Sequence, residues 1–288
     1  MNPVAIVKQR MRPLEPLPIG VEARAEPIPG IKAVIFDLYG TLIISAAGDI
    51  SLVSENVSMQ GMERALKALG GAVDDSLTGS SLQVYAAEIR AQQEQRRAEG
   101  VEYPEVEIRE VWGAIAERAG LKATFIELAA LEYECAVNPC WEMPGASDLL
   151  MQLSTSGLRL GIISNAQFYT HAVVAGLLQP GIEELQSDAR LNVFSYEERE
   201  GKPSLRLFSK AAEAAGKDGI EPHEILYVGN DFRKDIEPAS RVGFRTAFFA
   251  GDARSFRTGT VSPQKACDHA DVVLTDLRQL IDVLGLIS

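Results

Sequence analysis

An aspartate directly follows a short hydrophobic run near the start of the chain, in residues 33–42, which read AVIFDLYGTL. The β-branched and aromatic residues before Asp37 are typical of a strand that is buried on both faces. Gly40 permits a tight turn, and Thr41 places a hydroxyl beside it. Ligands of open α/β sheets bind at the carboxyl ends of the strands, which is where we expect the Asp37 carboxylate. Taken alone, this segment favours an aspartate that only closes a turn.

Three later segments also deliver polar side chains directly after hydrophobic runs. These residues are Ser164 and Asn165 after residues 158–163, Lys202 in the loop after residues 192–194, and Asn230, Asp231 and Asp235 after residues 225–228. Each has a simpler interpretation as a helix cap or a solvated charge. Because the ends of parallel strands share one edge, we expect these side chains to lie near Asp37.

The elements that must position these residues alternate between strands and helices from residue 144 onward. Short β-branched runs occur at 158–163, 192–194, 225–228, 246–249 and 272–274, with helical patterns between most of them. Such alternation indicates a parallel sheet. We therefore predict an α/β fold, with a Rossmann-like parallel sheet and helices on both faces. This core would comprise residues 31–44 and 144–288.

The long segment between these two parts of the core has a helical pattern instead. Apolar residues recur at helical spacing in residues 54–69, 82–98, 106–119 and 123–137, with short links between them. These features predict an all-α helical bundle over residues 45–143. The segment is too long for a single crossover between strands, so it is an insertion that leaves next to Asp37. We expect it to lie over the strand ends as a cap.

The first 30 residues contain six of the fourteen prolines. This density argues against a regular helix and favours an extended, Pro-rich arm over residues 1–30. The arm could wrap the domain, contact the partner subunit of a homodimer or stay disordered, and the sequence leaves these alternatives open.

Composition excludes several classes of partner. The chain is 46% hydrophobic and 24% charged, with a formal net charge of −12, so no strongly basic face is expected for nucleic acid or an anionic membrane. No transmembrane segment or signal peptide is visible. The three cysteines form no metal-binding pattern, and an odd number does not suit a disulfide framework. We therefore expect a cytoplasmic protein.

The order and placement of these motifs resemble those of the haloacid dehalogenase-like (HAD) superfamily, from about residue 31 to the end of the chain. DLYGTL is similar to its first motif, SN at 164–165 to its second, GKPSLRLF to its third and VGNDFRKD to its acidic fourth. The resemblance implies an aspartate nucleophile, Asp37, with Thr41 in the same motif, and a hydroxyl donor, Ser164, next to Asn165. It also implies that Lys202 binds the substrate anion and that the insertion is the family's helical cap.

For phosphatases of this superfamily, the resemblance implies one Mg²⁺ and a small phosphorylated substrate. The expected ligands are Asp37, the backbone carbonyl of Tyr39 and the acidic fourth motif. Either Asn230 or Asp231 could occupy the first acidic position of that motif, with Asp235 in the second. Mg²⁺ prefers hard oxygen ligands, which this set provides.

Tyr39 departs from the phosphatase pattern. Phosphatases of this superfamily usually carry a second aspartate at this position, as general acid and base, and a phenol is a poor base near neutral pH. Tyrosine here resembles the 2-haloacid dehalogenases, which need no metal but tend to have a tyrosine where this chain has Phe208. The sequence therefore favours a Mg²⁺-dependent phosphatase, and leaves open a dehalogenase or a weakly catalytic or non-catalytic binding protein.

Overall fold

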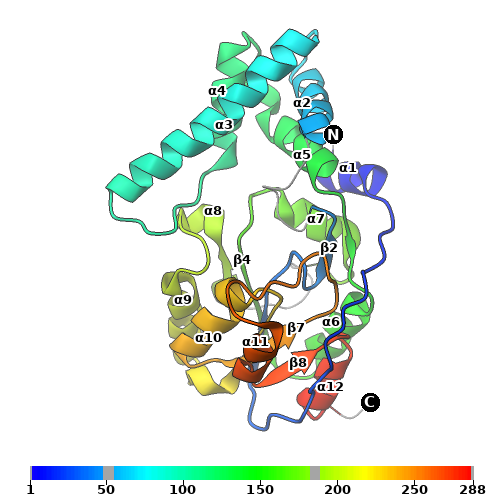
Figure 1. Cartoon of the computed structure of the whole chain (residues 1–288), viewed down its shortest axis with the longest axis vertical. Helices are drawn as coiled ribbons and strands as arrows, with labels where there is room; N and C mark the ends of the chain where they lie inside the picture. The colour runs from blue at the N-terminus through cyan, green and yellow to red at the C-terminus, as the bar shows by residue number, and fades with distance from the viewer. Residues whose placement is uncertain (1, 48–54, 182–188, 287–288) are drawn as a thin grey trace.

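A six-stranded parallel sheet forms the centre of the protein (Figure 1). The computed structural model describes residues 2–47, 55–181 and 189–286. The strands follow the order β5-β4-β1-β6-β7-β8. Their bounds are β1 (Ala33–Phe36), β4 (Arg159–Ser164), β5 (Asn192–Phe194), β6 (Ile225–Gly229), β7 (Arg245–Phe249) and β8 (Val272–Leu274). The β1 strand therefore lies between β4 and β6, inside the sheet.

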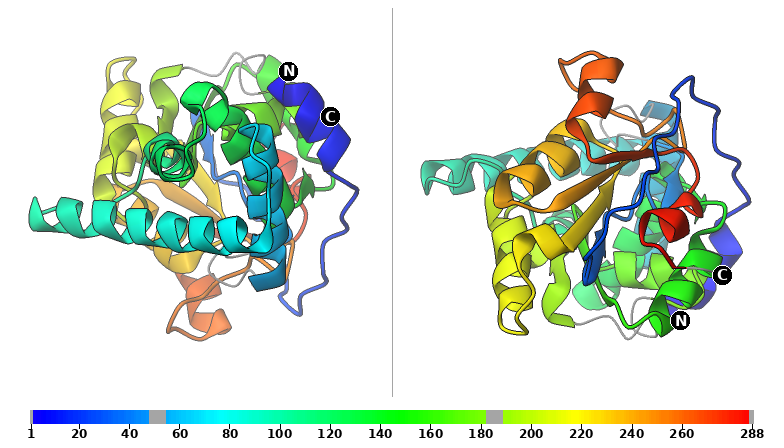
Figure 2. Two further views of the ribbon diagram at one scale, coloured as in Figure 1. Left: turned by 90° about the horizontal axis from the view of Figure 1, so that it is seen from above. Right: turned by 90° about the horizontal axis from the view of Figure 1, so that it is seen from below.

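Alternate residues of β1 face two separate hydrophobic clusters. Val34 and Phe36 pack on one face, whereas Ala33 and Ile35 pack on the other. The first face is covered by α6 (Ala146–Thr155), α7 (Thr170–Leu177) and α12 (Gln279–Val283), and the second by α9 (Leu205–Gly216) and α10 (Glu237–Val242). Figure 2 shows the sheet between these two helical layers. The predicted α/β fold, with a Rossmann-like sheet between helices, is confirmed.

Several short elements were not apparent in the sequence. They are α8 (Ser195–Glu198), α11 (Pro263–His269), the 3₁₀ turns η3 (Ala189–Leu191) and η4 (Pro222–Glu224), and the π-helical turn η5 (Phe232–Ile236). Only Ala266 of α11 is buried, where it packs near Ile236 and Phe248. One small apolar residue produces no helical periodicity, which explains why this helix was missed.

A helical insert, residues 55–137, leaves the core through a two-stranded antiparallel connection, β2 (Ile43–Ser45) with β3 (Cys140–Glu142). It consists of α2 (Glu55–Ala68), α3 (Asp75–Ala98), α4 (Ile108–Arg118), the 3₁₀ turn η2 (Ala123–Phe125) and α5 (Ile126–Val137). These helices share their own hydrophobic cluster, in which Trp112 is fully buried. The α3 helix begins earlier than the predicted position 82, because the Asp74 side chain caps it. The remaining part of the predicted insertion, residues 48–54, lies outside the described ranges.

The prediction that the prolines exclude a helix from the N-terminal arm is wrong for α1 (Pro3–Arg10). Pro3 occupies the first turn, where its missing N–H costs nothing, and the Asn2 side chain caps the helix. Ile6 and Val7 are buried in the cluster that α7 also lines. The rest of the arm is extended along the core, and Arg24 exchanges two backbone hydrogen bonds of 2.8 Å with Val273.

The helical insert also contacts the rest of the chain away from β2 and β3. Arg10 of α1 forms a bidentate ion pair with Glu132 of α5, with both donor–acceptor distances 2.9 Å. The loop after α3 descends toward α8 (Figure 1), and the Gly201 amide donates to the Tyr103 carbonyl at 2.8 Å. The insert is therefore held against the loop that precedes Lys202. None of the helices in the described ranges combines the length and apolar character needed to cross a membrane.

Candidate active site

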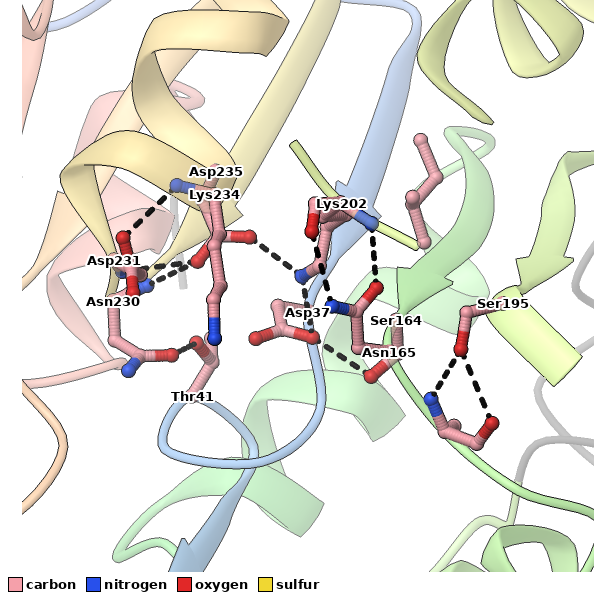
Figure 3. A network of polar contacts seen from close by, with 12 residues as sticks. Asp37, Thr41, Ser164, Asn165, Ser195, Lys202, Asn230, Asp231, Lys234 and Asp235 are labelled. Carbon is pink, nitrogen blue, oxygen red and sulfur yellow. Dashed lines mark hydrogen bonds and ion pairs between the residues drawn. The ribbon is translucent and has the colours of Figure 1, made fainter. Parts of the chain in front are cut away.

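Asp37 is the first residue after β1, and its amide continues the sheet by donating to the Val228 carbonyl at 2.9 Å. Its side chain is almost fully buried, and its Oδ1 accepts hydrogen bonds from Ser164 Oγ at 2.8 Å and Lys202 Nζ at 2.9 Å (Figure 3). Ser164 ends β4, the neighbouring strand. The structure therefore brings together the three residues that the sequence assigned to the first three motifs.

Gly40 makes the turn after Asp37 possible. Its φ is +89°, and a Cβ at this position would lie 2.6 Å from both Asn230 Nδ2 and Ser255 Cβ. An L-residue would be strained and would also displace these neighbours. The Thr41 hydroxyl then donates to Asn230 Oδ1 at 3.0 Å. The turn is thus fixed against the end of β6.

Lys202 is positioned through both its main chain and its side chain. Its amide donates to Asn165 Oδ1 at 2.7 Å, and its carbonyl accepts from Asn165 Nδ2 at 3.3 Å. Its Nζ contacts two carboxylates, Asp235 Oδ1 at 2.6 Å and Asp37 Oδ1 at 2.9 Å. Burial lowers the pKa of Lys202, but the two carboxylates outweigh burial and leave the pKa raised, so the ammonium stays charged.

Burial also dominates the pKa of Asp37. It raises the pKa of this carboxyl, and the ammonium of Lys202 only partly opposes the increase. The hydrogen bond from Ser164 acts in the same direction as Lys202. The nearby carboxylate of Asp235 adds to the effect of burial. A further cation at this site would stabilise the ionised form that nucleophilic attack requires.

Asp235 is fully buried, and both of its oxygens already have partners. Oδ1 accepts from Lys202 Nζ and lies 3.0 Å from the Tyr227 hydroxyl, while Oδ2 accepts from the amides of Asn230 and Asp231 at 3.1 and 2.9 Å. The turn η5 brings this side chain back beneath the end of β6. This arrangement favours a positioning role for Asp235 over direct contact with a metal. Sequence analysis did not identify Tyr227 as a site residue. The only signal was its hydroxyl group in a strand that is otherwise apolar.

Asn230 and Asp231 differ in how many of their side-chain atoms are occupied. Both polar atoms of the Asn230 side chain form hydrogen bonds. Its Nδ2 donates to the Ser255 carbonyl at 2.7 Å, and its Oδ1 accepts from the Thr41 hydroxyl. Asp231 Oδ1 accepts from the Lys234 amide at 2.9 Å, which caps η5. Its Oδ2 accepts no hydrogen bond from a described residue. Burial, assisted by the charge of Asp235, raises the pKa of Asp231.

Oxygen atoms suitable for Mg²⁺ remain at this edge of the sheet. Asp37 Oδ2, Asp231 Oδ2 and the Tyr39 carbonyl have no hydrogen-bond donor among the described residues. Within the described ranges, no group of three His, Cys, Asp or Glu side chains could hold a metal ion. Mg²⁺ commonly uses one or two carboxylates and keeps several waters. The donor set fits Mg²⁺ with Asp37 and Asp231 as the carboxylates.

Tyr39 is linked to α7 through a hydrogen bond of 3.0 Å between its hydroxyl and Thr170 Oγ1. Burial, together with the charge of Glu134, raises the pKa of Tyr39 well above its ordinary value of 10. A phenol with so high a pKa cannot serve as a base near neutral pH. Neither Thr170 nor Glu134 was singled out in the sequence, because each is near the site only through packing of the insert and α7.

These residues line a cavity of about 970 Å³ between the strand ends and the helical insert. Seven of the residues predicted for the site line this cavity, and all seven belong to the core. They are Asp37, Tyr39, Asn165, Lys202, Asn230, Asp231 and Asp235. The insert contributes Tyr85, Tyr103, Glu105 and Glu134 among others. Four arginines of the insert do not line this cavity, namely Arg90, Arg96, Arg97 and Arg109.

Several curated proteins are similar in sequence. An N-acetylmuramic acid 6-phosphate phosphatase of Pseudomonas aeruginosa is 25% identical over 260 residues, which cover 88% of this chain and 95% of that protein. A glyceraldehyde 3-phosphate phosphatase of Methanocaldococcus jannaschii is 27% identical over 141 residues, 49% of this chain and 55% of that protein. The chain thus spans about half the length of the glyceraldehyde 3-phosphate phosphatase that it matches.

Solved structures share the fold. A HAD phosphatase from Thermococcus onnurineus and a 2-haloacid dehalogenase from Pseudomonas syringae each superpose with a TM-score of 0.53 at 18% identity. Each match covers 88% of this chain and 98% of the other. At this identity the likeness concerns the fold, which phosphatases and dehalogenases share.

The family model described as haloacid dehalogenase-like hydrolase matches residues 31–243. This range contains β1 with Asp37, the helical insert, and the strand ends that carry Ser164, Lys202 and Asp231. The chain therefore belongs to the haloacid dehalogenase-like hydrolase family.

Proposed function

We propose that the protein is a Mg²⁺-dependent phosphatase that acts on small phosphate monoesters, with Asp37 as the nucleophile. The observation that carries this proposal is a pair of carboxylate oxygens, Asp37 Oδ2 and Asp231 Oδ2, that accept no hydrogen bond from a described residue, at a cavity that the buried ammonium of Lys202 also lines. A carboxylate and a phosphoryl group repel each other, so a site that brings them together needs cations. The phosphatases among the similar proteins support the same class of reaction.

In the proposed reaction, one oxygen of the Asp37 carboxylate attacks the phosphorus atom while the bond from phosphorus to the leaving oxygen breaks. The phosphoryl group is then bound to Asp37, and water cleaves the new bond to release inorganic phosphate and restore the carboxylate. Lys202 and the Ser164 hydroxyl hold the carboxylate in one orientation through Oδ1, so that its two oxygens can divide the roles of nucleophile and Mg²⁺ ligand. Asp37, Asp231 and the Tyr39 carbonyl would hold Mg²⁺, which would supply positive charge for the phosphoryl oxygens.

Tyr39 limits the proton transfers that this site can perform. The leaving oxygen must gain a proton, and the attacking water must lose one. A buried phenol whose pKa is raised well above 10 can donate a hydrogen bond but does not act as a base. We therefore expect slow turnover, and faster turnover for substrates whose leaving group is a stable anion.

We further propose that the helical insert acts as a cap that sets substrate specificity, with residues 45–143 as one unit and residues 31–44 and 144–288 as the other. The insert lines the cavity opposite Asp37 and is held to the core at Gly201 and through Arg10.

We also propose a cytoplasmic location. The three free cysteines agree with it, because thiols stay reduced there.

One observation favours a second candidate, a metal-independent 2-haloacid dehalogenase, since Tyr39 occupies the position where a phosphatase usually has an aspartate. The residue that a dehalogenase tends to have as tyrosine is here Phe208, which is fully buried against Tyr227. A substrate screen that records phosphate and halide release in parallel, with Mg²⁺ and with a chelator, separates the two. Metal-dependent release of phosphate supports the phosphatase, and metal-independent release of halide supports the dehalogenase.

A further inference from the structure

The cavity above Asp37 has two chemically different ends. Three cations, Arg233, Lys234 and Arg257, line it on the side of the fourth motif. The insert lines it with two carboxylates, Glu105, which lies within reach of the charge of Lys234, and Glu134, whose hydrogen-bond partners are the neutral groups of Asn138 and Tyr169. A substrate bound at Asp37 can therefore meet either the cations that follow β6 or the carboxylate of Glu134.

Glu134 is a buried carboxylate without a counter-ion. Its side chain accepts from Asn138 Nδ2 at 3.0 Å and from the Tyr169 hydroxyl at 2.9 Å. No ion pair joins it to any lysine or arginine of the described ranges, and the residues outside those ranges include neither type. A buried charge that is paired only with neutral groups is costly, and it is stabilised by any donor or cation that a ligand supplies.

Two separate hydrogen bonds, made by the neighbouring residues Tyr169 and Thr170, lie between this carboxylate and the reaction centre. Tyr39, two residues after Asp37, bonds to Thr170 through its hydroxyl. The neighbouring residue of Thr170 is Tyr169, which donates to Glu134. On the other side, Asn138 accepts from the Ser45 hydroxyl at 2.7 Å, so the stem of the insert is part of the same network. Hydrogen bonds therefore hold Glu134 in place beside Tyr39, the residue at the position where phosphatases of this family usually carry the general acid.

We propose that the Glu134 end of the cavity receives the leaving group of the substrate and selects leaving groups that carry hydroxyl or amino groups over those that carry a carboxylate. This inference rests on the proposed phosphatase function. It assigns Glu134 as a specificity-determining residue and the substrate class as phosphate monoesters of polyols, sugars or amino alcohols.

The selection follows from the hydrogen-bonding capacity of the two chemical groups. A hydroxyl or ammonium group of the ligand can donate to the remaining lone pairs of Glu134, whereas a carboxylate can only accept. A ligand carboxylate beside Glu134 would also place two like charges in a poorly solvated site, which disfavours binding strongly. In the described part of the chain, Glu134 is hydrogen-bonded to Asn138 and Tyr169 and to none of the three cations, which remain available to the phosphoryl group.

A matched series of three esters tests this proposal. Phosphoethanolamine, 2-hydroxyethyl phosphate and 2-phosphoglycolate have nearly the same size and differ in whether the far end is cationic, neutral or anionic. At pH 8 with Mg²⁺, we expect kcat/KM for the cationic and neutral esters to exceed that for 2-phosphoglycolate by about tenfold or more. Equal values, or a preference for 2-phosphoglycolate, would overturn the proposal and place the leaving group at the basic end.

Two variants connect the preference with Glu134. Glu134→Gln keeps the shape and one acceptor but removes the charge, so we expect it to reduce the preference for the cationic ester over the anionic one by about tenfold. Glu127→Gln removes an exposed carboxylate from the same helix, outside the cavity, and should keep the wild-type preference. A Glu134→Gln variant that is folded by circular dichroism and has unchanged selectivity would refute the role of Glu134.

Binding separates this proposal from the phosphatase proposal. Calorimetric affinities of the three esters are measured for the wild type and for Asp37→Asn, which removes the repulsion between the nucleophile and the phosphoryl group. Weaker binding of 2-phosphoglycolate supports the selection by Glu134 even if no ester is hydrolysed, a result that would contradict only the catalytic proposal. Hydrolysis without this binding preference, or no binding of any of the three esters, would contradict the inference about Glu134.

Discussion

Lys202 and Asp37 form a buried ion pair, with Nζ 2.9 Å from Oδ1 and side chains only 2% and 10% exposed. The same ammonium lies 2.6 Å from Asp235, so one cation compensates two carboxylates. Such an arrangement holds the Asp37 carboxylate in one orientation. It also makes the stability of the core depend on the Lys202 ammonium. Removal of the cation leaves two uncompensated buried charges.

We predict that Lys202→Met lowers the free energy of unfolding by about 3–5 kcal/mol, the usual cost of removing one partner of a buried pair. Urea denaturation of the purified variant measures this value. Lys210→Met is the matched control, because Lys210 is half exposed in its contact with Glu198 and such surface pairs contribute about 1 kcal/mol or less. A Lys202→Met variant as stable as the wild type would contradict the description of this ion pair.

Substitution of Tyr39 distinguishes the two catalytic candidates. In a phosphatase, Tyr39→Asp would provide a carboxylate that can protonate the leaving oxygen and accept a proton from water. General acid–base assistance contributes roughly a hundredfold or more, so phosphate release should rise clearly. In a dehalogenase the new charge beside Asp37 should lower halide release. Tyr39→Phe, which removes only the hydroxyl bonded to Thr170, controls for packing. A fall in phosphate release with Tyr39→Asp would show that the tyrosine itself performs a catalytic task.

Asp231 and Asp235 are expected to differ in their effect on Mg²⁺. Asp231 lines the cavity and its Oδ2 has no donor among the residues that the structure describes, whereas both oxygens of Asp235 accept hydrogen bonds within the protein. Calorimetric titration should therefore show weaker Mg²⁺ binding for Asp231→Asn than for Asp235→Asn. Asp235→Asn should instead lower the melting temperature, since it disrupts the buried contact with Lys202. The opposite order of Mg²⁺ affinities would mean that the two positions are wrongly assigned.

The titration of Glu134 predicts a pH dependence of stability. Burial raises the pKa of Glu134 in the folded protein, although the hydrogen bonds from Asn138 and Tyr169 oppose the increase. Between the ordinary glutamate pKa and the raised pKa of the folded protein, the folded state holds a proton that the unfolded chain has lost, so the contribution of Glu134 to stability falls as pH rises through this window. The free energy of unfolding of the wild type, relative to Glu134→Gln, should therefore decrease from pH 5 to pH 8. An increase over this range would show that the pKa of Glu134 is lowered by folding.

Much of the site could be predicted because it depends on local pattern. Hydrophobic runs that end in Asp37, Ser164 and Asp231 identify the strands and the edge at which they end. Parallel strands then bring these residues together whatever the details of the loops. The same reasoning predicts a helical insertion, since four amphipathic segments cannot belong to one crossover.

Other features depend on tertiary packing and leave no local signal. Glu134 lies on a helix of the insert and Thr170 begins α7, so their approach to Tyr39 follows only from how these helices pack. Helix α1 was missed because Pro3 was counted as a helix breaker, although it lies in the first turn, where proline is tolerated. The role of Asp235 was likewise not predictable, since the π-helical turn that directs it toward Lys202 has no sequence signature.

The central claim, Mg²⁺-dependent transfer of a phosphoryl group to Asp37, is tested most directly by phosphate release. The wild type and Asp37→Asn are compared on p-nitrophenyl phosphate and on small phosphate monoesters, in the presence of Mg²⁺ and of a chelator. We predict release by the wild type with Mg²⁺ only, and loss of release in a folded Asp37→Asn variant. Phosphate release that persists in Asp37→Asn or in the chelator would contradict the account, as would halide release from 2-haloacids with no phosphate release from any ester.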